Sequence, residues 1–133
     1  APEEFLPACG QGALAVQIRS DDGQMRRLCT SIDHAPTRIA TASERAFLAE
    51  LGGGCTLPAG AYGRFENDRL FRLSSVLLSE DGAVQIRRET TTAAADGGEA
   101  RELGRKLARD IRHGGGRDIL ERMGKANHES SSE

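Results

Sequence analysis

The chain has 133 residues, of which 38% are apolar and 29% are charged, and its net charge at pH 7 is −2. This length suits one domain with a single core, and no apolar run approaches the roughly 18 residues that a membrane span requires. A nucleic-acid-binding domain would carry a basic excess that this chain lacks, so we expect neither a membrane nor a nucleic acid among its partners.

The N-terminal quarter predicts a connector, a strand and a short helix. Residues 1–12 carry proline and glycine at both ends of a short apolar patch, which is typical of a connector. Apolar side chains alternate along Gly12–Arg19, and this period of two predicts a strand. Gln24–Ile32 predicts a short helix with Cys29 on its apolar face, so we expect Cys29 in the core.

A longer helix follows, with Pro36 in its first turn, where the missing N–H is tolerated. Asp33 is the expected N-cap, and His34 is expected to cap locally or lie on the surface. Apolar residues then recur at helical spacing as far as Leu51. Three glycines, Gly52–Gly54, end the helix, and Cys55 follows them directly.

The rest of the chain predicts a meander followed by two helices. The expected elements are strands at Ala59–Glu66, Leu70–Ser79 and Ala83–Glu89, a loop at Thr90–Gly98, an amphipathic helix at Glu99–His113, and a short helix at Arg117–Met123. The economical architecture is an α+β fold, in which a small antiparallel three-stranded sheet has helices packed on one face.

The cysteines do not indicate a disulfide framework or a metal site. Cys9, Cys29 and Cys55 are odd in number and show no C-x-x-C spacing. This pattern fits a reducing compartment. The three histidines do not complete a zinc-ligand cluster, so we expect no metal.

The Gly-Gly-Gly-Cys step is the most informative feature for chemistry. A thiol on a glycine-flanked loop is accessible. The C-terminal end of the preceding helix carries partial negative charge and would raise the pKa of this thiol, which disfavours a protease-like nucleophile. A cysteine that is alkylated once and stays alkylated needs access more than a low pKa. The alternative is a buried, inert Cys55 whose glycines serve only the turn.

Two segments resemble the porphobilinogen deaminase (hydroxymethylbilane synthase) family. Phe5–Arg19 is similar to its hinge and strand, and Ile32–Gly60 is similar to its helix and cofactor loop. The second segment contains Thr-Ala-Ser-Glu-Arg-Ala-Phe, and then Gly-Gly-Cys-Thr-Leu-Pro-Ala-Gly. The departures, at Cys9, Leu57 and Ala59, are small changes of packing. The later meander and helix match in order, so the resemblance covers essentially the whole chain.

The resemblance implies how the chain is organised. The family fold has three domains, and this chain matches only the last part. Residues 1–34 would be a hinge, strand and short helix left from upstream domains. Residues 35–124 would form the cofactor-attachment domain, and residues 125–133 a disordered tail. The strand would belong to an absent domain and would have an unpaired edge.

The resemblance also implies the chemistry. Family members join four porphobilinogen molecules head to tail with loss of ammonia, giving hydroxymethylbilane for haem and chlorophyll biosynthesis. A dipyrromethane primer is held by a thioether to one cysteine, which Cys55 matches. Gly53 and Gly54 would let this loop shift, and Gln11, Gly12 and Ala13 would neighbour the cofactor. The family's catalytic aspartate and its arginine and lysine cluster lie upstream, so we expect this chain alone to be inactive.

The resemblance further implies a transferase that is monomeric and cytoplasmic, with a plastid location left open. Its partners would be porphobilinogen, through the full-length enzyme, and the missing N-terminal domains. One alternative is a non-catalytic α+β accessory or binding domain without the cofactor. Another is a chain that reassembles with a separately encoded or cleaved N-terminal part.

Overall fold

The computed structural model describes residues 2, 4–52, 57–93 and 96–129, and the side chains as far as Met123. Its elements are the helices α1 (Gly23–Thr30), α2 (Ala35–Leu51), α3 (Gly97–Ile111) and α4 (Arg117–Glu129), a kinked turn at Arg112–Gly116, and the strands β1 (Ala59–Asn67), β2 (Leu70–Leu78) and β3 (Gln85–Ala93). This content confirms the predicted α+β class.

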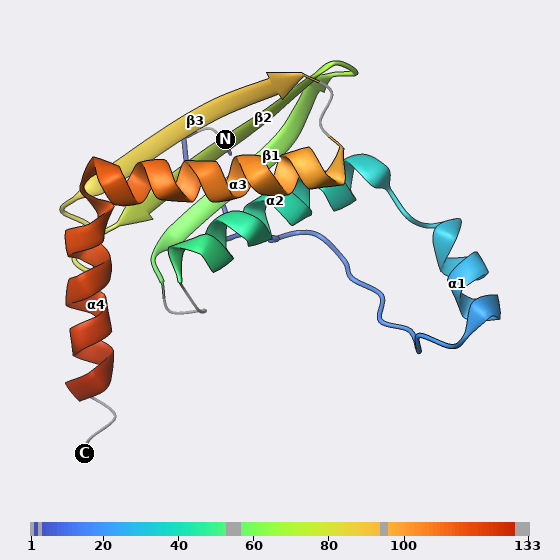
Figure 1. Ribbon diagram of the computed structural model, residues 1–133, viewed down its shortest axis with the longest axis horizontal. Helices are drawn as coiled ribbons and strands as arrows, with labels where there is room; N and C mark the ends of the chain where they lie inside the picture. Colours follow the sequence, from blue (N-terminus) through green and yellow to red (C-terminus); the bar gives the residue numbers. More distant parts are fainter. Residues whose placement is uncertain (1, 3, 53–56, 94–95, 130–133) are drawn as a thin grey trace.

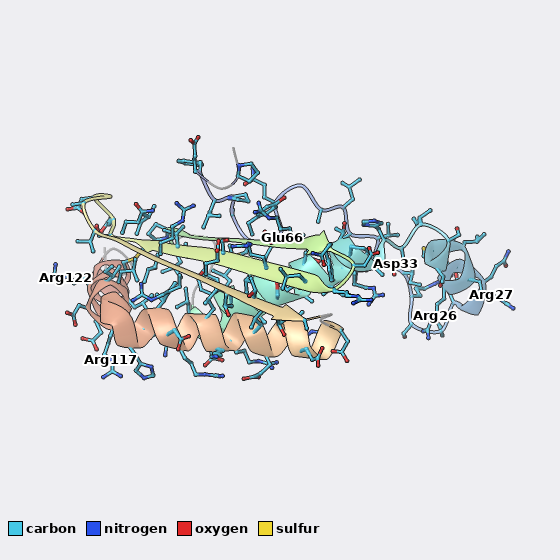
Figure 2. All side chains as sticks on the ribbon, turned by 90° about the horizontal axis from the view of Figure 1, so that it is seen from above. Arg26, Arg27, Asp33, Glu66, Arg117 and Arg122 are labelled. Carbon is cyan, nitrogen blue, oxygen red and sulfur yellow. The ribbon has the colours of Figure 1, made fainter. Side chains whose placement is uncertain are left out.

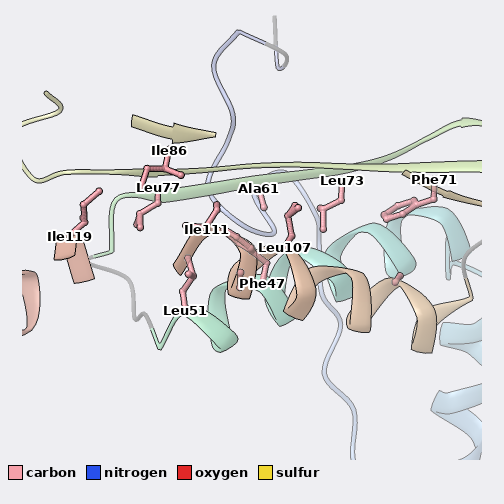
Figure 3. Packing of buried hydrophobic residues seen from close by; sticks show 12 residues of the cluster. Phe47, Leu51, Ala61, Phe71, Leu73, Leu77, Ile86, Leu107, Ile111 and Ile119 are labelled. Atoms are coloured by element: carbon pink, nitrogen blue, oxygen red, sulfur yellow. The ribbon is translucent and has the colours of Figure 1, made fainter. Parts of the chain in front are cut away.

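The sheet has the order β1-β2-β3, and both pairs of strands are antiparallel. Helices α2 and α3 run along one face of it (Figure 1). Side chains from the two helices and the sheet meet between these layers (Figure 3). The largest fully buried apolar side chains there are Phe47, Phe71, Leu73, Leu77 and Ile111. Burial of these aliphatic and aromatic groups is the main force that holds the layers together.

The two covering helices approach each other very closely at Gly104 of α3. A Cβ atom at this position would lie 2.2 Å from the carbonyl oxygen of Ser43 on α2. Ser43 and Phe47, which flank this crossing, are fully buried. Glycine is therefore required at this point because the backbone of α2 occupies the space that a side chain would need.

The opposite face of the sheet is polar. Arg72 on β2 forms ion pairs with Glu66 on β1 and Glu89 on β3. The sheet is thus one-sided, with an apolar face under the helices and a charged face away from them, as is common for antiparallel sheets.

Two boundaries differ from the sequence prediction. Strand β3 continues to Ala93, whereas Thr90–Gly98 was expected to be a loop. Threonine is β-branched and suits strands, and Thr90 and Thr92 pair with Leu73 and Phe71 of β2. Helix α4 extends to Glu129, so residues 125–129, which were expected in a disordered tail, are helical here.

The start of α2 also corrects one expectation. The N-cap is His34, whose Nδ1 accepts the backbone N–H of Thr37 at 3.4 Å. Asp33, the expected cap, instead pairs with Arg38 at 3.0 Å. Pro36 lies in the first turn as predicted.

Residues 13–34 lie apart from the layered body (Figure 1). Within the described ranges, residues 13–19 form no strand, although their alternation predicts one. A strand needs a neighbour to pair with, and here Leu14 is 99% exposed. Helix α1 buries none of its residues, so the expectation of a core position for Cys29 is wrong. Arg27 projects outward from this helix (Figure 2), whereas the guanidinium of Arg26 donates to the carbonyl oxygen of Ser20 at 2.6 Å.

Candidate functional site

The connection that carries Cys55 begins at a firmly held helix end. Leu51 at the end of α2 is 2% exposed, and Gly52 adopts the left-handed conformation with φ 75°. The backbone N–H of Gly52 returns to the carbonyl oxygen of Ala49 at 3.0 Å. The guanidinium group of Arg112 donates to the carbonyl oxygen of Leu51, also at 3.0 Å. These contacts satisfy carbonyl groups that a helix end otherwise leaves unpaired.

The connection ends at an equally fixed point. The backbone N–H of Leu78 on β2 donates to the carbonyl oxygen of Pro58 at 2.9 Å. Leu57 packs against the core, and β1 begins at Ala59. Cys55, Gly53 and Gly54 themselves lie outside the described residues, so their predicted roles remain predictions. The structure shows that the segment carrying them is held at both ends.

The N-terminal segment around residues 4–12, called the hinge below, meets the outer edge of β1 beside the end of this connection. Ala8 forms an isolated antiparallel bridge with Gly60. The backbone N–H of Ala61 donates to the carbonyl oxygen of Pro7 at 3.2 Å. Residues about fifty positions apart in the sequence are therefore adjacent where the chain leaves the cysteine loop.

The three predicted cofactor neighbours follow this contact. Gln11 is exposed, and its side-chain oxygen accepts the N–H of Ala8 at 3.1 Å. Gly12 has φ 83°, and the N–H of Ala13 donates to the carbonyl oxygen of Gly10 at 3.3 Å. These bonds organise the hinge internally. A role for Gln11, Gly12 and Ala13 beside a cofactor remains a prediction.

Glu44 is a residue of this region to which the sequence reasoning assigned no role. It lies on α2, and only 6% of it is exposed. One carboxylate oxygen accepts the N–H of Gly63 on β1 at 2.8 Å, and the other accepts the N–H of Gly10 in the hinge at 2.7 Å. Burial raises the pKa of Glu44, while these two N–H groups act to lower it.

A signal for Glu44 does exist in the sequence. Ala40, Glu44, Phe47 and Leu51 follow one another at spacings of four, three and four residues, which places them on one face of a helix. An acidic residue within such an apolar stripe is rarely buried without partners. The stripe therefore indicates a buried carboxylate with its own hydrogen-bond donors, although it cannot identify them.

Cys9 lies next to this carboxylate, and its environment suppresses thiolate chemistry. Burial, together with the nearby charge of Glu44, raises the pKa of Cys9 to about 12. Because the thiolate is the reactive form, Cys9 is a poor nucleophile at neutral pH. Its side chain packs against the hydrophobic core. Its role in this hinge is therefore packing.

The described residues offer neither a metal-ligand cluster nor a membrane-spanning helix. Within residues 2, 4–52, 57–93 and 96–129, no three His, Cys, Asp or Glu side chains gather in a way that could hold a metal ion. Over the same part of the chain, every helix is too short or too polar to cross a membrane.

Comparison with known proteins identifies the family. Residues 39–113 match the model of the porphobilinogen deaminase C-terminal domain. The chain is 47% identical over 119 residues to porphobilinogen deaminase from Thermus thermophilus, which covers 90% of this chain and 38% of that protein. It is 44% identical over 117 residues to the enzyme of the same name from Pelotomaculum thermopropionicum, covering 88% and 36% of the two chains.

The porphobilinogen deaminase of Coxiella burnetii is 40% identical over 122 residues, which cover 92% of this chain and 38% of that protein. This chain thus spans little more than a third of the length of these relatives. The family match, which includes the helix before the cysteine loop and the sheet after it, agrees with the resemblance seen in the sequence. The chain belongs to the porphobilinogen deaminase family and contains its C-terminal domain.

Proposed function

We propose that this chain is the cofactor-carrying C-terminal part of a hydroxymethylbilane synthase. The longer enzyme joins four porphobilinogen molecules head to tail with loss of ammonia and releases hydroxymethylbilane. The observation that carries this proposal is the family match over residues 39–113, which runs through the segment containing Cys55. The comparisons do not favour the alternative of an accessory domain without cofactor.

Cys55 is the proposed attachment point of the dipyrromethane. Its thiol would add to the exocyclic methylene carbon of an azafulvene, the electrophile left when a porphobilinogen unit loses ammonia. A sulfur–carbon bond would form, and the ring nitrogen of the azafulvene would take up the thiol proton. When bound, the dipyrromethane supplies the primer to which pyrrole units are added. The described flanks fit a tether, because Leu51 and Pro58 are both held by hydrogen bonds while the residues between them include three glycines. Such a tether makes each coupling intramolecular.

The activity is proposed for the longer protein and not for this chain by itself. The family's catalytic aspartate and its cluster of basic residues correspond to positions upstream of this sequence. The chain carries a net charge of −2, which gives no general attraction for an anionic substrate. We therefore propose that the isolated 133-residue chain does not convert porphobilinogen.

The test compares the full-length protein, the isolated chain, and two variants of the full-length protein, Cys55→Ser and Cys29→Ser. We expect hydroxymethylbilane from the full-length protein and from Cys29→Ser, and none from Cys55→Ser or the isolated chain. Cys29 is a matched control because it is a free cysteine on a helix that buries no residue. Full activity of Cys55→Ser would refute the tether, and turnover by the isolated chain would refute the dependence on upstream domains.

A further inference from the structure

Strand β1 forms an edge of the sheet, and edge strands expose unpaired backbone groups. Two N–H groups on the free side of β1 nevertheless have acceptors. The N–H of Ala61 donates to the carbonyl oxygen of Pro7, and the N–H of Gly63 donates to the carboxylate of Glu44. The edge is therefore completed partly by the hinge backbone and partly by a side chain from α2.

Glu44 also holds the hinge itself. Its second carboxylate oxygen accepts the N–H of Gly10 at 2.7 Å, so one side chain joins α2, β1 and the hinge. A carboxylate is costly to bury unless it is well paired. Two N–H donors at 2.7 and 2.8 Å offset this cost, because hydrogen bonds to a charged acceptor are stronger than neutral ones.

The hinge fits closely against β1, independently of Glu44. A Cβ atom at Gly60 would lie 2.7 Å from the carbonyl oxygen of Pro7 and 3.1 Å from that of Leu6. The absence of a side chain at Gly60 thus allows the two backbones to approach. Cys9 adds packing against the core on the inner side of the same segment.

Gly10 is the last hinge residue held by the body before the chain departs. After Gly10 and Gly12, which have φ angles of 76° and 83°, residues 13–22 run away from the sheet towards α1 (Figure 1). The same contact region lies within a few residues of Pro58, where the cysteine loop ends. The hinge and the loop end are therefore attached to the sheet at neighbouring positions.

We propose that Glu44 is a positioning residue that latches the hinge to the free edge of β1 and so fixes where residues 13–22 leave the domain relative to Pro58, the described end of the cysteine loop. The catalytic consequence rests on the proposed function, since the loop matters for turnover only if Cys55 carries the primer. The latch itself does not depend on any cofactor.

The substitution Glu44→Gln tests the latch with little change in size. The amide keeps one oxygen acceptor but turns an NH2 donor towards one of the two N–H groups, so one of the two bonds is lost. Gly60→Ala disturbs the hinge by a separate route, through the clash with Pro7. Glu50→Gln is the matched control, because Glu50 lies on the same helix and forms a partly exposed ion pair with Arg109, away from the hinge.

The first measurement is amide hydrogen exchange on the 133-residue chain, comparing Gly10 with Leu107 in the core of α3. We expect Glu44→Gln and Gly60→Ala to increase the exchange rate at Gly10 at least tenfold more than the rate at Leu107. We expect Glu50→Gln to leave the ratio of these two exchange rates unchanged. If both variants speed the two amides equally, or leave Gly10 protected, the latch is wrong. The ratio of the two exchange rates tests the latch even where a variant lowers global stability, because global unfolding exposes both amides to exchange alike.

The second measurement uses the full-length protein. We expect Glu44→Gln to lower kcat several-fold with KM unchanged, while intact mass shows Cys55 fully loaded. An unchanged kcat together with fast exchange at Gly10 would refute the positioning role. An unmodified Cys55 in the wild-type protein would instead refute the proposed function, and the exchange ratio would still stand as the test of the latch.

Discussion

The guanidinium group of Arg112 donates a hydrogen bond to the carbonyl oxygen of Leu51 at 3.0 Å, across 61 residues of sequence. Arg112 begins the kinked turn between α3 and α4, and Leu51 is the last residue of α2 before the cysteine loop. The kink after α3 thus supplies a cation to the negative end of α2, where a positive charge is favourable. The start of the cysteine loop is held by a side chain from the far end of the domain.

Arg112→Ala is expected to lower the free energy of unfolding by about 1 kcal/mol, the typical net contribution of one intramolecular hydrogen bond. Urea denaturation followed by circular dichroism measures this change. Arg117→Ala is the control, since Arg117 is exposed on the first turn of α4 (Figure 2). We expect the free energy of unfolding of Arg117→Ala to stay within about 0.5 kcal/mol of that of the unsubstituted chain. Equal effects of the two substitutions would show that the Arg112–Leu51 contact contributes nothing specific.

Gly104→Ala is expected to destabilise the domain by about 1–3 kcal/mol or more, the usual range for overpacking. The added methyl group would lie 2.2 Å from the carbonyl oxygen of Ser43, so α2 and α3 would have to separate. Gly97→Ala is the matched control on the same helix, because its nearest neighbour would be the end of the Arg101 side chain at 3.6 Å. Thermal unfolding of both variants gives the comparison, and a Gly104→Ala chain as stable as Gly97→Ala would contradict the close helix contact.

The raised pKa of Glu44 gives the stability of the chain a distinct pH dependence. In the unfolded chain this carboxyl titrates near its ordinary value of 4.5, and burial moves the folded value upward. Between the two values the folded chain binds more protons than the unfolded chain, so the free energy of unfolding falls as pH rises. The stabilising contribution of protonation is full below 4.5 and is lost as pH rises through the folded pKa.

Glu44→Gln removes this dependence while leaving the exposed carboxyl groups unchanged. We therefore expect the difference in unfolding free energy, wild type minus Glu44→Gln, to become smaller as pH rises from about 4.5 through the folded pKa. Urea titrations at several pH values between 4 and 8 measure this difference. A difference that stays constant, or that grows with pH, would contradict the cause assigned to the raised pKa.

Cys9 is expected to resist alkylation. With its pKa raised to about 12, almost none of its thiol ionises at pH 8. In a Cys55→Ser chain, which leaves two thiols, iodoacetamide should label Cys29 at least ten times faster than Cys9. Peptide mapping at timed intervals gives the two rates. Comparable rates would mean that the hinge opens often enough to expose Cys9, and would count against its buried position.

Much of the fold could be predicted from local patterns. Gly52 ends α2 where the glycine run indicated, and the apolar stripe of α3 that contains Leu107 and Ile111 is buried as its spacing predicts. The errors arise where tertiary contacts decide. Thr90 looks like part of a low-complexity loop until β2 is present to pair with it. Cys29 lies on an apolar helix face, but that helix buries none of its residues.

The sequence located the candidate site but not its supports. The glycine run drew attention to the loop that carries Cys55, and the family resemblance implies the tether there, which remains a proposal. The partners of Glu44 could not be identified, since its donors at Gly10 and Gly63 are backbone groups of residues far away in the sequence. The contact of Arg112 with a backbone carbonyl is hidden for the same reason.

The most direct test of the account is the mass of Cys55 in the full-length protein. Intact mass spectrometry with peptide mapping should find an adduct of two linked pyrroles on the Cys55 peptide, and none on the peptides that contain Cys9 or Cys29. The Cys55→Ser variant should lack the adduct and the activity together. An active full-length enzyme with an unmodified Cys55, or with the adduct on another cysteine, would contradict the account.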